Sequence, residues 1–189
     1  MKRRNVLVLA LTGALAAPAW ALELDELMRA LSAQKIARGT FVERKYIAML
    51  DAPVTSSGEL SFTAPSRLER RTLKPRLESV VLDGGTLTIT RGERQMVMQV
   101  QDHPALGALT ESVRGTLAGD RQALERHFLL TLTGTLDRWT LVLKPREPRI
   151  RGYVLEVRIA GERGEVQTVE VEQSDRDRSV MTITKVAGS

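Results

Sequence analysis

Apolar residues near the start of the chain recur at helical spacing, and the period changes to two further on. Between residues 22 and 38 the apolar positions fall on one face of a helix, namely Leu24, Leu27, Met28, Leu31 and Ile36. Gly39 follows and is a typical stop signal. The pattern therefore predicts a helix from Leu22 to Arg38.

From residue 40 onwards, apolar and polar residues alternate in short segments separated by turn residues, which is typical of strands. The predicted strands are Thr40–Leu50, Glu59–Ala64, Arg67–Leu73, Leu77–Leu82, Thr86–Thr90, Gln95–Gln101, Leu129–Leu136, Arg138–Leu143, Tyr153–Ala160, Glu165–Gln173 and Ser179–Val186. Asp83-Gly84-Gly85 predicts a tight hairpin turn. Leu136-Asp137-Arg138 predicts either a turn or a bulge.

A helical segment interrupts this series of strands. Pro104 is favourable at a first helical position, and an apolar stripe follows it, formed by Leu106, Leu109, Val113 and Leu117. Gly119 ends the stripe, and Asp120 is a good N-cap for a second short helix through Arg126.

These elements predict a mainly β protein of the α+β type: one strongly curved antiparallel sheet or incomplete β-barrel, with helices covering its concave opening. A closed barrel and a sandwich are the alternatives. Alternation predicts which side chains face the concave side, namely Leu60, Phe62, Met96, Met98, Val100, Tyr153, Leu155, Val157 and Ile159.

The first 21 residues have the pattern of a secretory signal peptide. A basic start at residues 2–4 precedes the apolar run Val6–Ala17, and Ala19-Trp20-Ala21 fits a cleavage site. A membrane anchor is the weaker interpretation, because the run is short and Pro18 breaks it. We expect an exported, periplasmic domain of residues 22–189, which is long enough to bury a core without disulfides.

The net charge of the whole chain is +5, and aromatic residues make up 4%. Lys2, Arg3 and Arg4 account for three of the positive charges, which leaves +2 for residues 22–189. Binding of nucleic acid is therefore not expected, because it would require a stronger basic excess with interleaved aromatic residues.

Residues that could support catalysis are scarce. The chain has no cysteine and only two histidines, His103 and His127, which have no metal-ligand spacing. No serine lies in a G-x-S-x-G turn. We therefore expect no enzyme, no catalytic residue, no metal and no cofactor.

Basic residues gather in the strand before the hairpin, among them Arg67, Arg70 and Arg71. One interpretation is a solvated strand, since charges protect sheet edges from aggregation. The other is a cationic rim that contacts an acidic partner or an anionic headgroup.

The order of motifs carries a family resemblance. "GTFVERKYIAML", "SSGELSFTAPSRLERRTLKP", "LESVVLDGGTLTI", "HPALGALTESVRGTLAGD" and "HFLLTLTGTLDRWTLVLKPRE" follow one another in the sequence. Together they resemble the outer-membrane lipoprotein carriers, the LolA-like family. Ala64 stands where such carriers often have an arginine before the proline, so the resemblance is to a divergent member.

The resemblance implies a monomeric periplasmic carrier that encloses acyl chains of a lipoprotein or lipid. It also implies transfer from an inner-membrane transporter to an outer-membrane acceptor. The residues expected to bind lipid are Leu60, Phe62, Met96, Met98, Val100, Leu106, Leu109, Leu141, Tyr153, Leu155 and Val157. The alternative is a protein-interaction module that uses the same half-barrel without a lipid.

Overall fold

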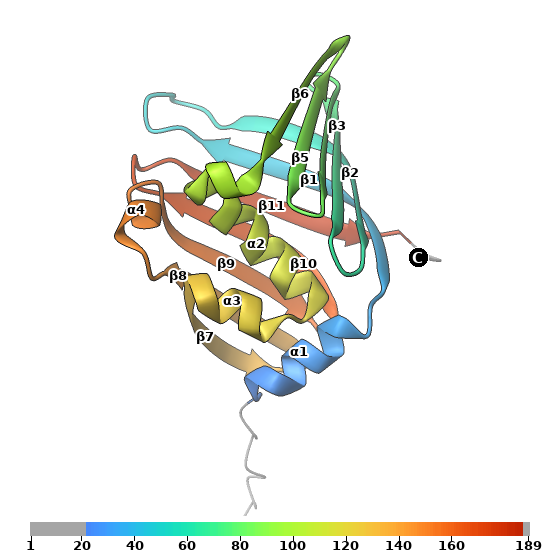
Figure 1. The fold of residues 1–189 in the computed structure, drawn as a ribbon, viewed down its shortest axis with the longest axis vertical. Helices are drawn as coiled ribbons and strands as arrows, with labels where there is room; N and C mark the ends of the chain where they lie inside the picture. Colours follow the sequence, from blue (N-terminus) through green and yellow to red (C-terminus); the bar gives the residue numbers. More distant parts are fainter. Residues whose placement is uncertain (1–21, 187–189) are drawn as a thin grey trace, which may run out of the picture.

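The computed structural model describes residues 22–186, so the predicted signal peptide lies outside the described residues. In residues 22–186 all eleven strands join one antiparallel sheet, in the order β6-β5-β4-β3-β2-β1-β11-β10-β9-β8-β7 (Figure 1). Their bounds are β1 Ile36–Tyr46, β2 Val54–Thr63, β3 Arg67–Lys74, β4 Glu78–Asp83, β5 Thr86–Arg91, β6 Arg94–Gln99, β7 Phe128–Thr135, β8 Arg138–Pro145, β9 Val154–Glu162, β10 Glu165–Gln173 and β11 Arg178–Lys185.

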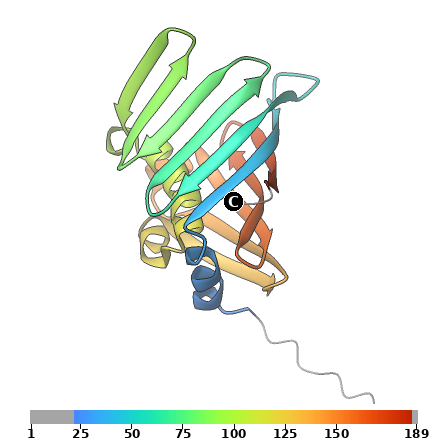
Figure 2. The same cartoon turned by 90° about the vertical axis from the view of Figure 1, so that its right-hand side faces the viewer.

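The helices lie on one side of this sheet, which curves around them (Figure 2). They are α1 Leu24–Ser32, α2 Pro104–Ala118, α3 Arg121–His127 and α4 Pro148–Arg151. The edge strands β6 and β7 do not pair with each other, so the sheet is not a closed barrel. The predicted fold class, a strongly curved antiparallel sheet with helices on its concave side, is confirmed.

The first helix is shorter than predicted, because it ends at Ser32. Ile36 is 51% exposed and pairs with Thr63, so it belongs to β1 and not to the apolar stripe. Gly39 is a strand residue opposite Leu60 and Lys185. No glycine or proline marks the true boundary. Long-range strand pairing determines where this helix ends.

Two further boundaries differ from the predictions. β6 ends at Gln99, and Val100–Asp102 forms a single 3-10 turn that leads into α2. The segment between β8 and β9 contains the short helix α4, which begins at Pro148 and was not among the predicted helices.

The hairpin turn between β4 and β5 is confirmed. Asp83 pairs with Thr86, so Gly84 and Gly85 form a two-residue loop. Both glycines have positive φ, 54° and 88°, as the hairpin turns that match the strand twist require. Leu136 and Asp137 make a second tight loop, since Thr135 pairs with Arg138.

Pairing irregularities contribute to the bend of the sheet. β2 and β3 slip by one residue beside Gly58, where an added Cβ would lie 1.9 Å from the Arg71 carbonyl oxygen. β9 and β10 slip beside Leu155, which has no partner between the pairs of Val154 and Glu156. Bulges of this kind bend a strand and increase its twist.

The slip at Leu155 changes which side chains of β9 are buried. Val154 is buried and Leu155 is 44% exposed, whereas strict alternation with Val157 predicted the reverse. The predicted face is therefore wrong at Leu155 and correct at Val157 and Ile159, which are fully buried.

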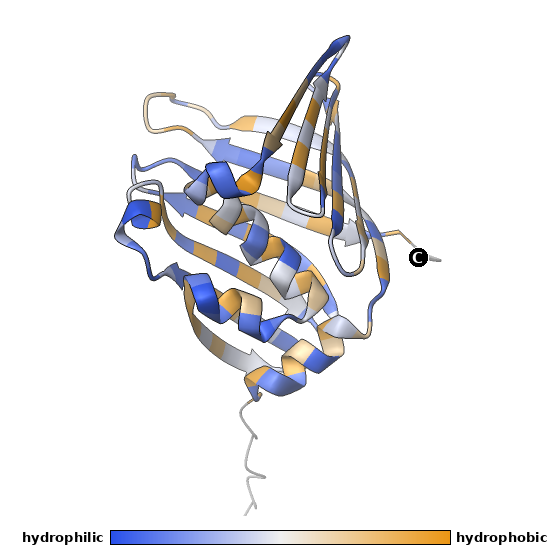
Figure 3. Ribbon diagram, viewed as in Figure 1, coloured by the Kyte–Doolittle hydropathy of each residue, from blue (hydrophilic) through white to orange (hydrophobic). Residues whose placement is uncertain are grey.

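The main core lies under the helices in the half of the sheet formed by β7 to β10. Apolar and polar residues alternate along these strands (Figure 3), and the apolar ones pack against α1, α3 and α4. The largest buried side chains of this core include Trp139, Phe128, Leu141, Leu143, Leu27, Leu31 and Leu124.

Candidate ligand-binding cavity

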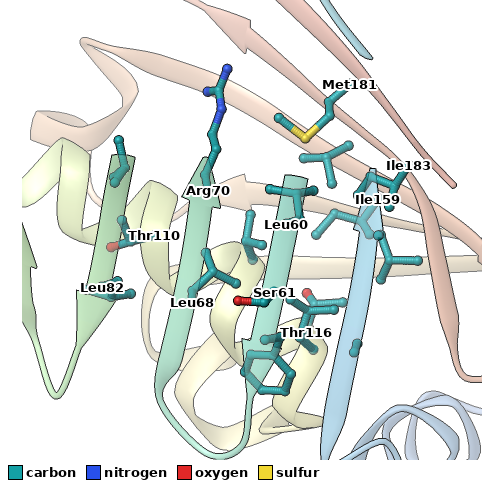
Figure 4. A pocket seen from close by; sticks show the side chains of 18 of the residues that line it. Leu60, Ser61, Leu68, Arg70, Leu82, Thr110, Thr116, Ile159, Met181 and Ile183 are labelled. Atoms are coloured by element: carbon teal, nitrogen blue, oxygen red, sulfur yellow. The ribbon is translucent and has the colours of Figure 1, made fainter. Parts of the chain in front are cut away.

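The other half of the concave face is not filled by the core. Between α2 and the strands β1 to β5, β10 and β11 lies a cavity of about 360 Å³ with a mostly apolar lining (Figure 4). Pockets that bind small molecules typically have volumes of about 300–1,000 Å³ and apolar walls with a few polar groups.

Strand register brings the sheet side of the lining together in rows. One row crosses five strands, formed by Ala37, Phe62, Leu68, Leu82 and Leu87. The neighbouring row is formed by Gly39, Leu60, Arg70 and Val80. All nine line the cavity, because paired residues in an antiparallel sheet share one face.

Helix α2 supplies the opposite wall and has two different faces. Its small residues are buried, namely Ala108, Ser112, Gly115 and Thr116. They allow close packing, and a Cβ at Gly115 would lie 2.8 Å from Leu124 of α3. The predicted stripe of Leu106, Leu109, Val113 and Leu117 lines the cavity. The small residues therefore allow the helix to pack closely, while its large ones border the cavity, and Leu109 and Val113 also pack against the core.

One side chain links α2 to the far half of the sheet. Arg114 donates to the Pro65 carbonyl in the β2–β3 turn at 3.0 Å, and to Glu111 and Asp120. Hydrogen bonding to Glu111 raises the pKa of the Arg114 guanidinium above its usual value although burial opposes this. Asp120 also caps α3 by accepting from Ala123 N–H, which confirms the predicted N-cap.

A charged cluster interrupts the apolar lining. Arg70 Nη2 donates to Glu43 Oε2 at 2.6 Å and to Ser56 Oγ at 3.2 Å. Ser56 Oγ in turn donates to Glu43 Oε2 at 3.3 Å. The Arg70 guanidinium carbon lies 4.7 Å from the centre of the Phe41 ring. The Arg70 and Glu43 side chains are 29% and 16% exposed.

The structure separates the three arginines that were grouped as a rim. Arg67 contacts Asp83 and Glu69, and Arg71 contacts Glu59, all on the convex face. Arg70 lies on the concave face and lines the cavity. Adjacent residues of a strand point to opposite faces, so these arginines do not form one patch.

The side chains expected to bind lipid fall into three groups. Leu60, Phe62, Leu106 and Leu109 line the cavity. Leu141 and Val157 are fully buried in the core beneath the helices. The remaining five lie elsewhere and do not line it, namely Met96, Met98, Val100, Tyr153 and Leu155.

The methionines of β6 share the concave face without reaching the cavity. Met98 pairs with Leu87, and Met96 pairs with Ile89. Met96 is 50% exposed, because β6 is an edge strand beyond the limit of the helical cover. Tyr153 is 66% exposed beside a second hollow, to which Leu106 and Leu109 also contribute.

Sequence reasoning missed the part of the lining that comes from the last strands. Val166, Val169 and Val171 of β10 line the cavity, together with Ser179, Met181 and Ile183 of β11. Alternation in Ser179–Lys185 is a signal for this face. The pairing of β11 with β1, which places Met181 opposite Glu43, could not be read from local sequence.

Histidines and carboxylates of the described residues do not form a metal centre. Within residues 22–186 there is no cluster of three potential metal ligands. His127 Nδ1 is itself buried and lies 3.5 Å from Glu147 Oε1, outside the cavity lining. Over the same range no helix has both the length and the apolar character needed to cross a membrane.

The protein is thus a half-open antiparallel sheet with an apolar cavity that is covered by helices. The family model described as outer membrane lipoprotein carrier protein LolA-like matches residues 16–188. The chain therefore belongs to the LolA-like family, as the motif order predicted. Curated proteins provide no match to the sequence.

Several solved structures are similar at low sequence identity. A LolA superfamily protein from Nitrosomonas europaea is 12% identical over 85% of this chain and 89% of its own, with a TM-score of 0.48. MucB in the Pseudomonas aeruginosa MucA/MucB complex is 17% identical over 88% of this chain and 56% of its own, with a TM-score of 0.46. LprF from Mycobacterium bovis is 11% identical over 88% of this chain and 94% of its own, with a TM-score of 0.38.

Proposed function

We propose that this protein is a periplasmic carrier that binds acyl chains of a lipoprotein or lipid in the cavity between α2 and the sheet. It shuttles them from the inner toward the outer membrane. The proposal rests on one observation, the leucine face of α2 turned toward an unfilled apolar cavity.

The physical need for such a cavity is large. Each methylene removed from water contributes about 0.8 kcal/mol. A dodecanoyl chain exposed to water therefore carries a penalty of roughly 9 kcal/mol, which makes spontaneous exchange between membranes slow. A carrier lowers this barrier by offering an apolar wall during transit.

The family and the predicted signal peptide support a proposal for the partners. An exported carrier would receive its load from an inner-membrane transporter and deliver it to an outer-membrane acceptor. The carrier would act as a monomer without metal or cofactor, and its chemistry would be binding and release only.

The proposal is tested by acyl binding to the protein purified from the periplasm of an expression host. Lipids that co-purify are extracted and identified by mass spectrometry. The purified protein is then titrated with 1-monododecanoylglycerol against a fluorescent acyl probe. Saturable displacement at one site supports a carrier. Absence of both co-purified lipid and displacement would favour the protein-interaction module.

Arg114 should control how readily the cavity opens. Arg114→Lys keeps a positive charge beside Glu111 and Asp120 but loses the planar fork that also reaches Pro65. Losing one hydrogen bond between α2 and the turn costs about 1 kcal/mol. We therefore expect the acyl probe to associate about 5-fold faster in stopped-flow fluorescence.

Arg121→Lys is the matched control for this measurement. Arg121 ties α3 to Asp25 of α1 and does not line the cavity. Its association rate should equal that of the unmodified protein. A rate unchanged in Arg114→Lys as well would show that the contact with Pro65 does not limit ligand entry.

A further inference from the structure

The charged cluster of Arg70, Glu43 and Ser56 affects which acyl compounds can bind in the cavity. Leu60 and Val80 stand directly opposite Arg70 in the two neighbouring strands. The guanidinium nevertheless reaches past β2 to Glu43 of β1. A polar group is therefore built into an otherwise apolar wall, at the end of the cavity where Ser179 and Val171 also line it.

Stability of the fold does not by itself account for an ion pair at this position. Removing two charges from water is costly, and apolar side chains of similar size would often serve the fold as well. Moreover, Arg70 Nε is buried from solvent and has no hydrogen-bond partner. An unpaired buried donor is unfavourable. The Nε donor is therefore unsatisfied within the protein, but it is enclosed, and a ligand can contact only the rest of the Arg70 side chain, which is 29% exposed.

The charge balance of the cluster limits which polar group a ligand can place beside Arg70. Glu43 already accepts from Arg70 and from Ser56, so the guanidinium charge is compensated. A second carboxylate beside Arg70 would also lie close to Glu43, and like charges repel strongly where water is scarce. An uncharged acceptor, such as an ester or amide carbonyl, can accept from the guanidinium without this repulsion.

Other cations of the lining do not change this balance. Lys185 donates to Glu165 at 2.5 Å, and both side chains line the cavity. Arg38 also lines the cavity and has an interaction partner within the protein. Arg70 is the cation that combines an ion pair, an aromatic contact with Phe41 and an unpaired buried Nε.

We propose that the cavity selects acyl chains whose polar end is an uncharged hydrogen-bond acceptor, as in acyl esters and amides, over free fatty acids. Glu43 acts as the specificity-determining residue, because it neutralises the Arg70 guanidinium that would otherwise attract a carboxylate. This inference rests on the proposed acyl-binding function and names the class of its ligand.

The test compares two ligands with one acyl chain length, dodecanoate and 1-monododecanoylglycerol, at pH 8, where dodecanoate is ionised. Dissociation constants are measured by displacement of a fluorescent acyl probe. The unmodified protein should bind the glycerol ester at least ~10-fold more tightly than dodecanoate. Glu43→Gln keeps the size and an acceptor but removes the charge. It should tighten dodecanoate binding at least ~10-fold, so that the ratio of the two dissociation constants shifts toward dodecanoate.

The double variant Glu43→Gln with Arg70→Gln separates charge from shape. It removes both charges and should lose the gain in dodecanoate affinity, while thermal melting confirms that each variant is folded. If Glu43→Gln does not fold, the double variant and the unmodified protein still provide the comparison of the two ligands.

The outcomes distinguish this inference from the proposed function. Equal binding of both ligands to the unmodified protein, or a dodecanoate affinity that Glu43→Gln leaves unchanged, overturns the selectivity and leaves the carrier function standing. Failure of every variant and of the unmodified protein to bind either ligand overturns the proposed function itself.

Discussion

Leu109→Glu is expected to abolish acyl binding, raising the dissociation constant of 1-monododecanoylglycerol at least ~100-fold. Leu109 lies in the middle of the cavity-facing stripe of α2 and is partly buried. A carboxylate there would have to lose its water to face an acyl chain, which is unfavourable. Displacement of the fluorescent acyl probe measures the effect, and thermal melting shows whether the variant is folded.

Two control variants make the result specific. Leu109→Met keeps the apolar surface and about the same volume, so binding should change little. Leu129→Glu introduces the same charge on β7, where Leu129 is 53% exposed and outside the cavity lining. If a folded Leu109→Glu variant binds 1-monododecanoylglycerol as tightly as Leu129→Glu does, the cavity is ruled out as the acyl site.

Local sequence signals predicted those features of the fold that depend on residues close together in the sequence. The turn at Gly84 and Gly85 depends on positive φ angles that glycine adopts without strain. The cap of α3 depends on Asp120 accepting from the Ala123 N–H. Both are short-range effects. The end of α1 depends on strand pairing of Ile36 with Thr63, which no local signal announces.

The cavity was only partly predictable, for a related reason. Alternation showed that Leu60 and Phe62 share a face with one another, but it could not show which strands adjoin. The first and last strands meet in the middle of the sheet, where β11 pairs with β1 and adds Met181 and Ile183 to the lining.

The ion pair of Arg70 could not be predicted from local sequence either. In the sequence it stands in a run of basic residues and reads as part of an exposed strand. Its partner Glu43 is 27 residues away in the sequence, and the ion pair forms because β1 and β3 both flank β2. A single slip of β3 would have placed Arg71 in the cavity instead.

The two halves of the concave face should respond differently to loss of side-chain volume. In the β7–β10 half, Trp139 is 1% exposed, and its Nε1 donates to the Arg163 carbonyl at 2.9 Å. The ring packs so closely on Gly161 that an added Cβ would lie 2.6 Å from Trp139 Cζ2. In the other half, Leu68 is partly buried and already borders empty space.

Trp139→Ala is therefore expected to lower the free energy of unfolding by about 3–5 kcal/mol, because it leaves a void in a filled core. Such a loss is a large part of the roughly 5–15 kcal/mol that stabilises a typical domain. The midpoint of thermal unfolding should fall by on the order of 10 °C. Leu68→Ala should cost only about 1 kcal/mol, since it enlarges a cavity that exists already. Urea unfolding of both variants measures the difference. Similar losses at the two positions would show that the space beside Leu68 is packed as tightly as the core, which would count against a cavity available to a ligand.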